Sequence, residues 1–200
     1  MNKYYPILEP EKYYHIYNHA VGKSDIFKSE GNYYFFLEKY KQYISPFVDT
    51  FAFCLLPNHF HIAIRVKEES VLLTLPKFQT LTKLDTHISK QFSNFFSCYT
   101  QAFNQQQSRR GTLFEKPFKR KLIETDEYFI NLIHYIHYNP VHHGFVKDLR
   151  DWKFTSYESF FSTKATLLKR NEVIAWFHDI KAFEEFHKRE LDDKITIDFE

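Results

Sequence analysis

The sequence FAFCLLPNHFHIAIRV, residues 51–66, decides the fold. Residues 51–56 form a short apolar run that predicts a buried strand. Pro57-Asn58 then favours a turn, because proline fixes its own backbone and asparagine tolerates turn geometry. Beyond the turn the residues alternate, so that one strand face would carry Phe60, Ile62, Ile64 and Val66, and the other His59, His61, Ala63 and Arg65. The stretch therefore predicts two strands joined by a tight corner.

Strands and helices also alternate on either side of this stretch. Residues 13–21 are rich in β-formers and predict a first strand. Apolar residues recur at helical spacing from about Glu30 to Ile44, which predicts an amphipathic helix that stops before Pro46. A long helix is expected over about Pro76 to Gln106.

A further strand and helix complete the pattern. Lys119–Glu124 predicts the strand, and Thr125 can cap a helix that Asn139-Pro140 would end. The core stripe of that helix would be Phe129, Leu132, Ile133 and Ile136. Hairpins thus alternate with helices, which predicts an α+β fold with a ferredoxin-like antiparallel sheet and helices packed on it.

Length and composition indicate one domain over residues 1–150 and a C-terminal extension over residues 151–200. Hydrophobic residues make up 44% of the 200 residues and aromatic residues 20%, enough for a sizeable core. The extension is rich in aromatic residues, so we expect it to dock on the domain and to contain a final helix near Asn171–Leu191.

Cysteine usage and hydropathy indicate a cytoplasmic protein. Cys54 and Cys98 lie in apolar surroundings with no close pairing, which suits a reducing compartment. No leader sequence is visible, and no apolar run approaches the roughly 18 residues of a membrane span. We therefore expect no membrane partner.

Charge is distributed unevenly although the net charge is only +2. Residues 101–125 hold six basic and two acidic side chains, a net +4, whereas residues 179–200 hold four basic and eight acidic ones, a net −4. Aromatic residues are interleaved with the basic ones, so the segment is suited to contact phosphates and unpaired bases. The alternative at this point is a solvated loop and strand edge. The predicted DNA-binding residues are Arg65, Arg109, Arg110, Lys116, Lys119, Arg120 and Lys121.

His59 and His61 are the candidate metal ligands. Residues two apart on a strand project from the same face, so both imidazoles can converge on one cation while Phe60 anchors the strand in the core. Two histidines alone do not fix the identity of the metal. The alternative is a pair of half-exposed strand histidines without a ligand.

Tyr135 and Asn139 form the second candidate pair. A spacing of four places them on one face of a helix, beside the predicted core stripe, where the phenol could reach a cleft at the edge of the core. A tyrosine that attacks phosphorus conserves the energy of the phosphodiester in a phosphotyrosyl ester, and Asn139 offers an amide oxygen as a third metal ligand. The alternative for Tyr135 is an ordinary tyrosine at the core edge. By helix phase His134 and His137 point away from it, so we interpret both as bystanders.

Four collinear motifs resemble the insertion-sequence 200-like and REP-associated tyrosine transposases, which are HUH enzymes with a single catalytic tyrosine. The stretch LLPNHFHI, residues 55–62, resembles their HUH strand, and YIHYNPV, residues 135–141, followed by Gly144, resembles their catalytic helix. Residues 14–27 resemble the first strand, and residues 111–119 resemble the segment before the last strand. The likeness covers roughly residues 13–160.

The resemblance implies a DNA strand-transfer enzyme. Tyr135 would cleave single-stranded DNA near a hairpin, leaving a 5′-phosphotyrosine and a free 3′-hydroxyl, and would rejoin strands by the reverse attack. Mg or Mn would be held by His59, His61 and Asn139, with no small-molecule cofactor. The family includes homodimers and monomers, and the protein would be nucleoid-associated when bound to DNA. His19 stands where an arginine is usual, and His142-His143 replaces Arg-Ala, which concerns DNA affinity or hairpin specificity more than chemistry.

Three other functions stay open at this point. A nucleic-acid hairpin-binding protein of the same fold that no longer transposes would bind without cleaving. A metal-dependent phosphodiesterase would activate water instead of Tyr135 and form no covalent adduct. A relaxase or replication initiator would use the same histidine pair but usually carries larger appended domains.

Overall fold

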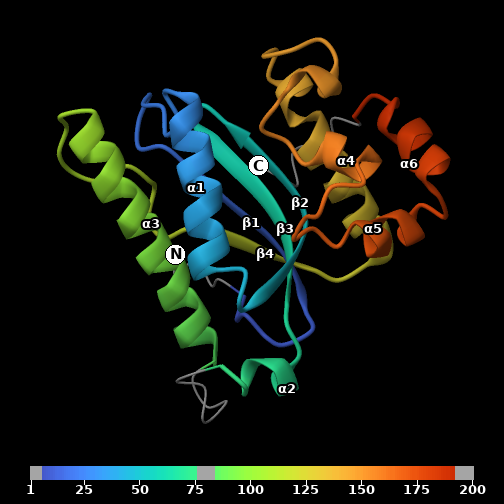
Figure 1. The fold of residues 1–200 in the computed structure, drawn as a ribbon, viewed down its shortest axis with the longest axis horizontal. Helices are drawn as coiled ribbons and strands as arrows, with labels where there is room; N and C mark the ends of the chain where they lie inside the picture. Colours follow the sequence, from blue (N-terminus) through green and yellow to red (C-terminus); the bar gives the residue numbers. More distant parts are fainter. Residues whose placement is uncertain (1–5, 76–83, 192–200) are drawn as a thin grey trace.

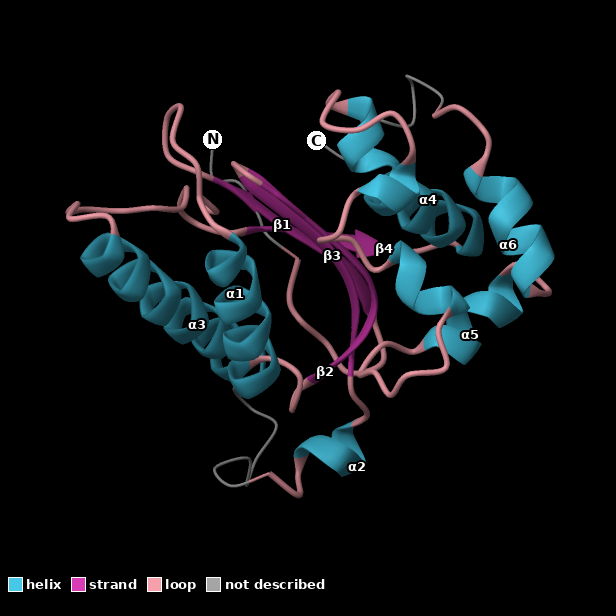
Figure 2. Cartoon of the chain, turned by 45° about the horizontal axis from the view of Figure 1, so that its top comes forward, coloured by secondary structure: helices cyan, strands magenta, loops and turns pink. Residues whose placement is uncertain are grey.

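The computed structural model describes residues 6–75 and 84–191 and forms a four-stranded antiparallel sheet with helices on both faces (Figures 1 and 2). The strands are β1 (Tyr13–His19), β2 (Val48–Leu56), β3 (His59–Val66) and β4 (Lys119–Ile123). The helices are α1 (Glu30–Tyr43), α2 (Glu69–Leu72), α3 (Leu84–Gln106), α4 (Asp126–His142), α5 (Arg170–Trp176) and α6 (Ile180–His187). Leu149–Asp151 and Tyr157–Phe161 form short 3₁₀ turns.

The sheet has the strand order β2-β3-β1-β4, in which the first and third strands are central. Together with α1 and α3 this is the β-α-β-β-α-β arrangement of a ferredoxin-like fold, which confirms the predicted fold class. β2 and β3 are joined by the two residues Pro57-Asn58, as the sequence predicted. Backbone amides of Ile26 and Phe27 donate to the Pro57 carbonyl at 2.7 and 3.0 Å and hold this corner in place.

Each face of the sheet has its own hydrophobic cluster. Phe60, Ile62, Ile64 and Val66 pack under α1 and α3, whereas Ala63 belongs to the cluster under α4, α5 and α6. The alternation in β3 thus decides which side chains meet which layer of helices, and Figure 2 shows the sheet between the two layers. His59 and His61 share the face of α4.

α4 extends beyond its predicted end. The sequence placed the end at Asn139-Pro140, but the helix continues to His142 with Pro140 inside it. Proline removes one backbone donor, yet the next amides find helical or turn acceptors: His143 donates to Asn139 and Gly144 to Val141. Gly144, at φ +71°, then reverses the chain. As a result Asn139 lies within regular helix.

The C-terminal extension contains two short helices instead of the single helix predicted over Asn171–Leu191. His178 adopts φ +73°, which interrupts the helix, and the Asp179 carboxylate caps α6 by accepting from the Ala182 amide at 2.8 Å. The break allows Phe177 and Phe183 to pack together, with ring centroids 5.1 Å apart, in the cluster beneath α4.

Two further differences concern the predicted boundaries of elements. β2 starts at Val48, three residues before the predicted strand, and the short helix α2 was not predicted. The predicted start of the long helix near Pro76 falls outside the described residues, and α3 is described from Leu84. Among the described residues, no helix combines the length and hydropathy that a membrane crossing requires.

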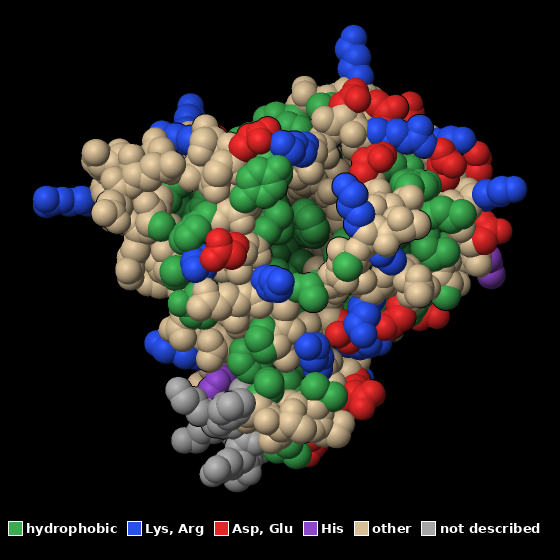
Figure 3. Space-filling model, in the orientation of Figure 1, with side chains coloured by type: hydrophobic (Ala, Val, Ile, Leu, Met, Phe, Trp, Pro, Cys, Tyr) green, Lys and Arg blue, Asp and Glu red, His purple; other side chains and the backbone are tan. Residues whose placement is uncertain are grey.

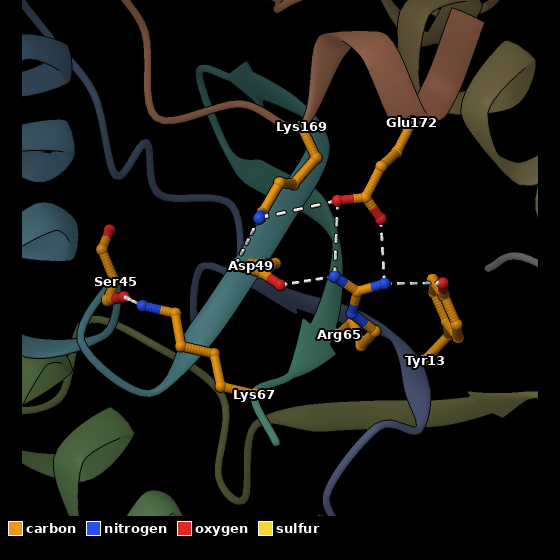
Figure 4. A network of polar contacts seen from close by, with 7 residues as sticks. All are labelled: Tyr13, Ser45, Asp49, Arg65, Lys67, Lys169 and Glu172. Atoms are coloured by element: carbon orange, nitrogen blue, oxygen red, sulfur yellow. Dashed lines mark hydrogen bonds and ion pairs between the residues drawn. The ribbon is translucent and has the colours of Figure 1, made fainter. Parts of the chain in front are cut away.

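An ion-pair network joins the extension to the sheet (Figure 4). The Arg65 guanidinium donates to Asp49 at 2.7 Å, to Glu172 of α5 at 2.9 Å and to the Tyr13 hydroxyl at 3.1 Å. Lys169 lies 3.4 Å from the same Asp49. The chain around residue 154 also bonds along β2, where the Leu55 amide donates to the Phe154 carbonyl at 2.9 Å. The extension therefore packs on both β2 and α4, and the proposed division at residue 150 stays a prediction.

Candidate active site

A cavity of about 310 Å³ lies where β1 and β3 meet the C-terminal half of α4. It brings together three of the predicted functional residues, His59, His61 and Tyr135. Its other lining residues are His19, Glu115, Lys119 and His143. Asn139, the fourth predicted residue, reaches the site through its contact with His59.

Strand register fixes the surroundings of the two histidines. His59 is the first residue of β3 and pairs with His19 of β1, and His61 pairs with Tyr17. The paired rings stack, with centroids 4.8 Å apart for His19 and His59 and 5.8 Å apart for Tyr17 and His61. Both histidines are buried, with 3% and 1% of their surface exposed, and are not half-exposed.

Both ring nitrogens of His59 lie close to side-chain oxygens. Its Nδ1 lies 2.8 Å from the Asn58 side-chain oxygen, and because a neutral imidazole carries only one proton, we assign that proton to Nδ1, at the shorter of the two oxygen contacts, which leaves Nε2 a lone pair. That Nε2 lies 3.1 Å from Oδ1 of Asn139, which is also an acceptor. No proton lies between these two lone pairs, so they repel each other. A cation bound by both atoms would remove that repulsion.

Nε2 of His61 is a third buried atom that can act as a ligand. Its Nδ1 lies 2.9 Å from Nε2 of His15, and its own Nε2 is buried with no hydrogen-bond partner among the described residues. Within those residues no three His, Cys, Asp or Glu side chains are arranged to hold a metal ion. His59, His61 and Asn139 would offer a divalent cation two imidazole nitrogens and one amide oxygen.

Burial keeps these imidazoles neutral. Desolvation first, and then the neighbouring His19 and His143, lower the pKa of His59 to about 3. Desolvation, followed by the nearby His15, holds the pKa of His61 well below its usual range. Neutral imidazole is the form that binds metals, so the site is in its ligand form at neutral pH.

Tyr135 lies against His61, with the ring centroids 5.2 Å apart and the planes at 88°. Its side chain is fully buried while it lines the cavity, a degree of burial that helical spacing alone did not indicate. Leu132, Ile133 and Ile136 bury the neighbouring positions of α4 in the core and thereby set the rotation of the helix. Tyr135 and Asn139, one turn apart, consequently face β3 together.

The other histidines of α4 divide into two groups. His134 and His137 point away from the cavity, as predicted, and His137 bonds to His187 of α6 at 2.9 Å. His143, in contrast, lines the cavity, with its ring centroid 4.9 Å from that of His59. The sequence showed His142-His143 only as a departure from the family pattern and did not indicate this position.

The predicted DNA-binding cations do not form one surface. Lys119 and Lys121 share the sheet face of the site, because they pair with Tyr17 and His15 of β1. Arg120 points to the opposite face and bonds to Ser89 and Asp85 of α3 at 2.6 and 3.3 Å.

The remaining cations lie elsewhere. Arg65 is held in the ion-pair network described above. Arg109 donates to Asn104 and to the Thr112 carbonyl at 2.9 and 3.0 Å, and Arg110 and Lys116 are exposed. In the view of Figure 3 basic and acidic side chains are interspersed.

A larger groove of about 1240 Å³ lies on the α3 side of the segment 111–118. Lys116 and Arg120 line it together with Phe96, Phe118 and polar residues of α3. Glu115 lines both this groove and the active-site cavity, so the two hollows are neighbours across one segment of chain.

Comparisons with known proteins concern the relatives and the fold of the chain. No family model matches the chain. A Haemophilus influenzae protein named as a REP-associated tyrosine transposase is 30% identical over 124 residues, which are 61% of this chain and 66% of that relative. The solved structure of a REP-associated tyrosine transposase bound to a REP hairpin has the same fold, with a TM-score of 0.63 and 17% identity over 82% of this chain and 87% of that one. The chain, which spans 66% of the length of that curated relative, is thus similar in sequence and in fold to REP-associated tyrosine transposases.

Proposed function

We propose that this protein cleaves and rejoins single-stranded DNA at a hairpin, with Tyr135 as the nucleophile and a divalent metal held by His59, His61 and Asn139. The observation that carries the proposal is the cavity itself, in which a tyrosine and two neutral imidazoles from separate elements meet. The lone pairs of His59 Nε2 and Asn139 Oδ1 face each other at 3.1 Å, which supports the metal site.

In the proposed reaction the Tyr135 oxygen attacks the scissile phosphorus. A bond forms between the phenolic oxygen and phosphorus, and the bond from phosphorus to the 3′ oxygen breaks. The phenol loses its proton and the 3′ oxygen gains one, which leaves a 5′-phosphotyrosine and a 3′-hydroxyl. Attack by a 3′-hydroxyl on the phosphotyrosine reverses the step and joins the strands.

The chain's own residues orient the reacting groups. Packing of α4 holds the Tyr135 ring perpendicular to His61, so that the phenol cannot rotate away from the cavity. Mg or Mn bound there would polarise the phosphate and stabilise its developing charge. Lys119 lines the same cavity, and with Lys121 it supplies positive charge for the phosphates of the strand.

The test is a covalent adduct on a denaturing gel. Protein is incubated with Mn²⁺ and hairpin-bearing single-stranded DNA labelled at either its 5′ or its 3′ end. A 5′-phosphotyrosine predicts that the 3′ label migrates with the protein, while the 5′ label appears on a shortened free strand. Tyr135→Phe should abolish the adduct, and His61→Ala should nearly abolish it.

Tyr138→Phe is the matched control, because Tyr138 lies on the same helix but packs edge to face against His134, away from the cavity. An undiminished adduct with Tyr135→Phe would show that Tyr135 is not the nucleophile. Cleavage without any adduct would favour a phosphodiesterase that activates water. Hairpin binding without cleavage, unaffected by Tyr135→Phe, would favour a binding protein of the same fold.

A further inference from the structure

His15 is a buried histidine of β1 that the proposed chemistry does not use. It is fully buried and pairs across the sheet with Ala63, so it lies one step along the strand face from His61. Its Nε2 is 2.9 Å from Nδ1 of His61, and the ring centroids are 5.1 Å apart with the planes at 22°. This contact joins a first-strand residue directly to a proposed metal ligand.

The direction of this hydrogen bond decides which nitrogen of His61 carries the proton. A neutral imidazole has one N–H and one lone pair. A proton on Nδ1 leaves a lone pair on Nε2, whereas a proton on Nε2 leaves no lone pair on that nitrogen for a cation. If His15 accepts from Nδ1, the free Nε2 of His61 becomes the third lone pair beside His59 and Asn139. If His15 donates instead, His61 presents a buried N–H to the site.

Tyr17 keeps the two rings in register. Its ring stacks on His15 at 4.6 Å and 19° and on His61 at 5.8 Å and 11°, so the three rings are nearly parallel. The arrangement matches that of His59, whose Nδ1 is similarly occupied by Asn58. Each proposed ligand thus has one nitrogen bonded within the protein and the other directed to the cavity.

We propose that His15 is a positioning residue that accepts a hydrogen bond from Nδ1 of His61 and thereby fixes the tautomer in which Nε2 of His61 binds the metal. The inference rests on the metal site of the proposed function. Outer hydrogen-bond partners of metal-ligating histidines fix the ring orientation and raise ligand basicity, and their loss typically weakens metal affinity about 10- to 100-fold.

The test compares His15→Leu with His15→Gln. Leucine fills the space without an acceptor, whereas the glutamine side-chain oxygen can accept from Nδ1 of His61. Ile16→Val is the control, because Ile16 is equally buried on the same strand but faces the opposite cluster. Mn²⁺ affinity is measured by electron paramagnetic resonance of the free ion, and nitrogen-15 spectra of the metal-free protein report the tautomer of His61.

We expect the wild type to show a protonated Nδ1 on His61. His15→Leu should lose this fixed tautomer and bind Mn²⁺ about 10- to 100-fold more weakly. His15→Gln and Ile16→Val should keep both properties within a few-fold. A His15→Leu protein with the wild-type Mn²⁺ affinity, or a wild type protonated on Nε2 of His61, would overturn the role of His15. A wild type with Nδ1 protonated that takes up no Mn²⁺ would instead overturn the metal site.

Discussion

Two pairs of buried histidines lie on opposite sides of α4, and they differ in the hydrogen bonds that their ring nitrogens make. On one side His137 and His187 close every ring nitrogen: His187 donates to the Phe183 carbonyl, accepts from His137, and His137 accepts from the Ser156 hydroxyl. On the other side His59 and His61 each bond through Nδ1 and direct Nε2 to Asn139 or to no partner among the described residues.

The difference shows that burial alone does not mark a functional histidine. Desolvation lowers the pKa of His187 to about 3, the same value as for His59, so both pairs are neutral. The closed pair forms a complete chain of donors and acceptors and is explained by structure. The open pair has lone pairs that the protein itself does not satisfy, which is what a cation site requires.

The largest contrast is expected between His61→Ala and His187→Ala. Loss of a ligand should reduce adduct formation by at least about 100-fold, because metal stabilisation of the transition state is removed. Loss of His187 should instead cost about 2–4 kcal/mol of unfolding free energy, through a cavity and an unsatisfied partner, with little effect on the adduct yield of the folded protein. Adduct assays beside urea denaturation measure both. Equal effects of the two variants on cleavage would remove the distinction.

A fall in pH should destabilise the folded protein through the buried histidines on both sides of α4. His15, His59 and His187 have folded pKa values of about 3, below the unfolded value near 6.5, so the unfolded state binds more protons in acid. Their contribution to the free energy of unfolding is fully present above about pH 6.5. Below that pH it falls by about 1.4 kcal/mol per pH unit for each histidine. Urea denaturation at pH 7.0 and 5.5 measures the fall, and His187→Gln should make it shallower. A flat profile over this interval would contradict neutral burial.

Added Mn²⁺ should sharpen the comparison, because the proposed metal site uses the open pair and not the closed one. At a free concentration 100 times Kd, a ligand that binds only the folded state adds about 2.7 kcal/mol of stability. We expect a rise in Tm for the wild type and for His187→Gln, and none for His61→Ala. The same rise in His61→Ala would place the bound metal elsewhere.

The smallest effect is expected for Ser156→Ala, which removes one end of the closed chain. His137 Nε2 and the Phe53 amide both lose their partner, at distances of 2.8 and 2.9 Å, so we expect a loss of about 1–3 kcal/mol in unfolding free energy. Mn²⁺ affinity should not change. Asn58→Ala is the counterpart at the open pair and should weaken Mn²⁺ binding instead. Both are measured by urea denaturation and by titration of Mn²⁺.

Local patterns predicted much of this fold. The alternation in residues 59–66 and the turn at Pro57-Asn58 predicted β3 with its observed bounds and the face of its histidines. The Thr125 cap and the apolar stripe predicted α4 and its phase, and the Thr125 hydroxyl accepts from the Tyr128 amide as expected.

Contacts between distant segments were not predictable in the same way. The position of His15 beside His61 depends on the register of β1 against β3, which no periodicity encodes. The assignment of Arg120 to the α3 face and of Lys119 to the site depends equally on the pairing of β4 with β1. The break at His178 requires a positive φ at a residue type that gives little sign of it.

The placement of Tyr135 and Asn139 one turn apart on α4 has a mechanical consequence. A helix of this length moves as a rigid rod, and four residues span about 6 Å along it. Displacing α4 from the sheet would therefore withdraw the attacking oxygen and the amide ligand in one motion, while both imidazoles stayed on β3. A rigid displacement of α4 would therefore never leave one of these two helix groups in place without the other.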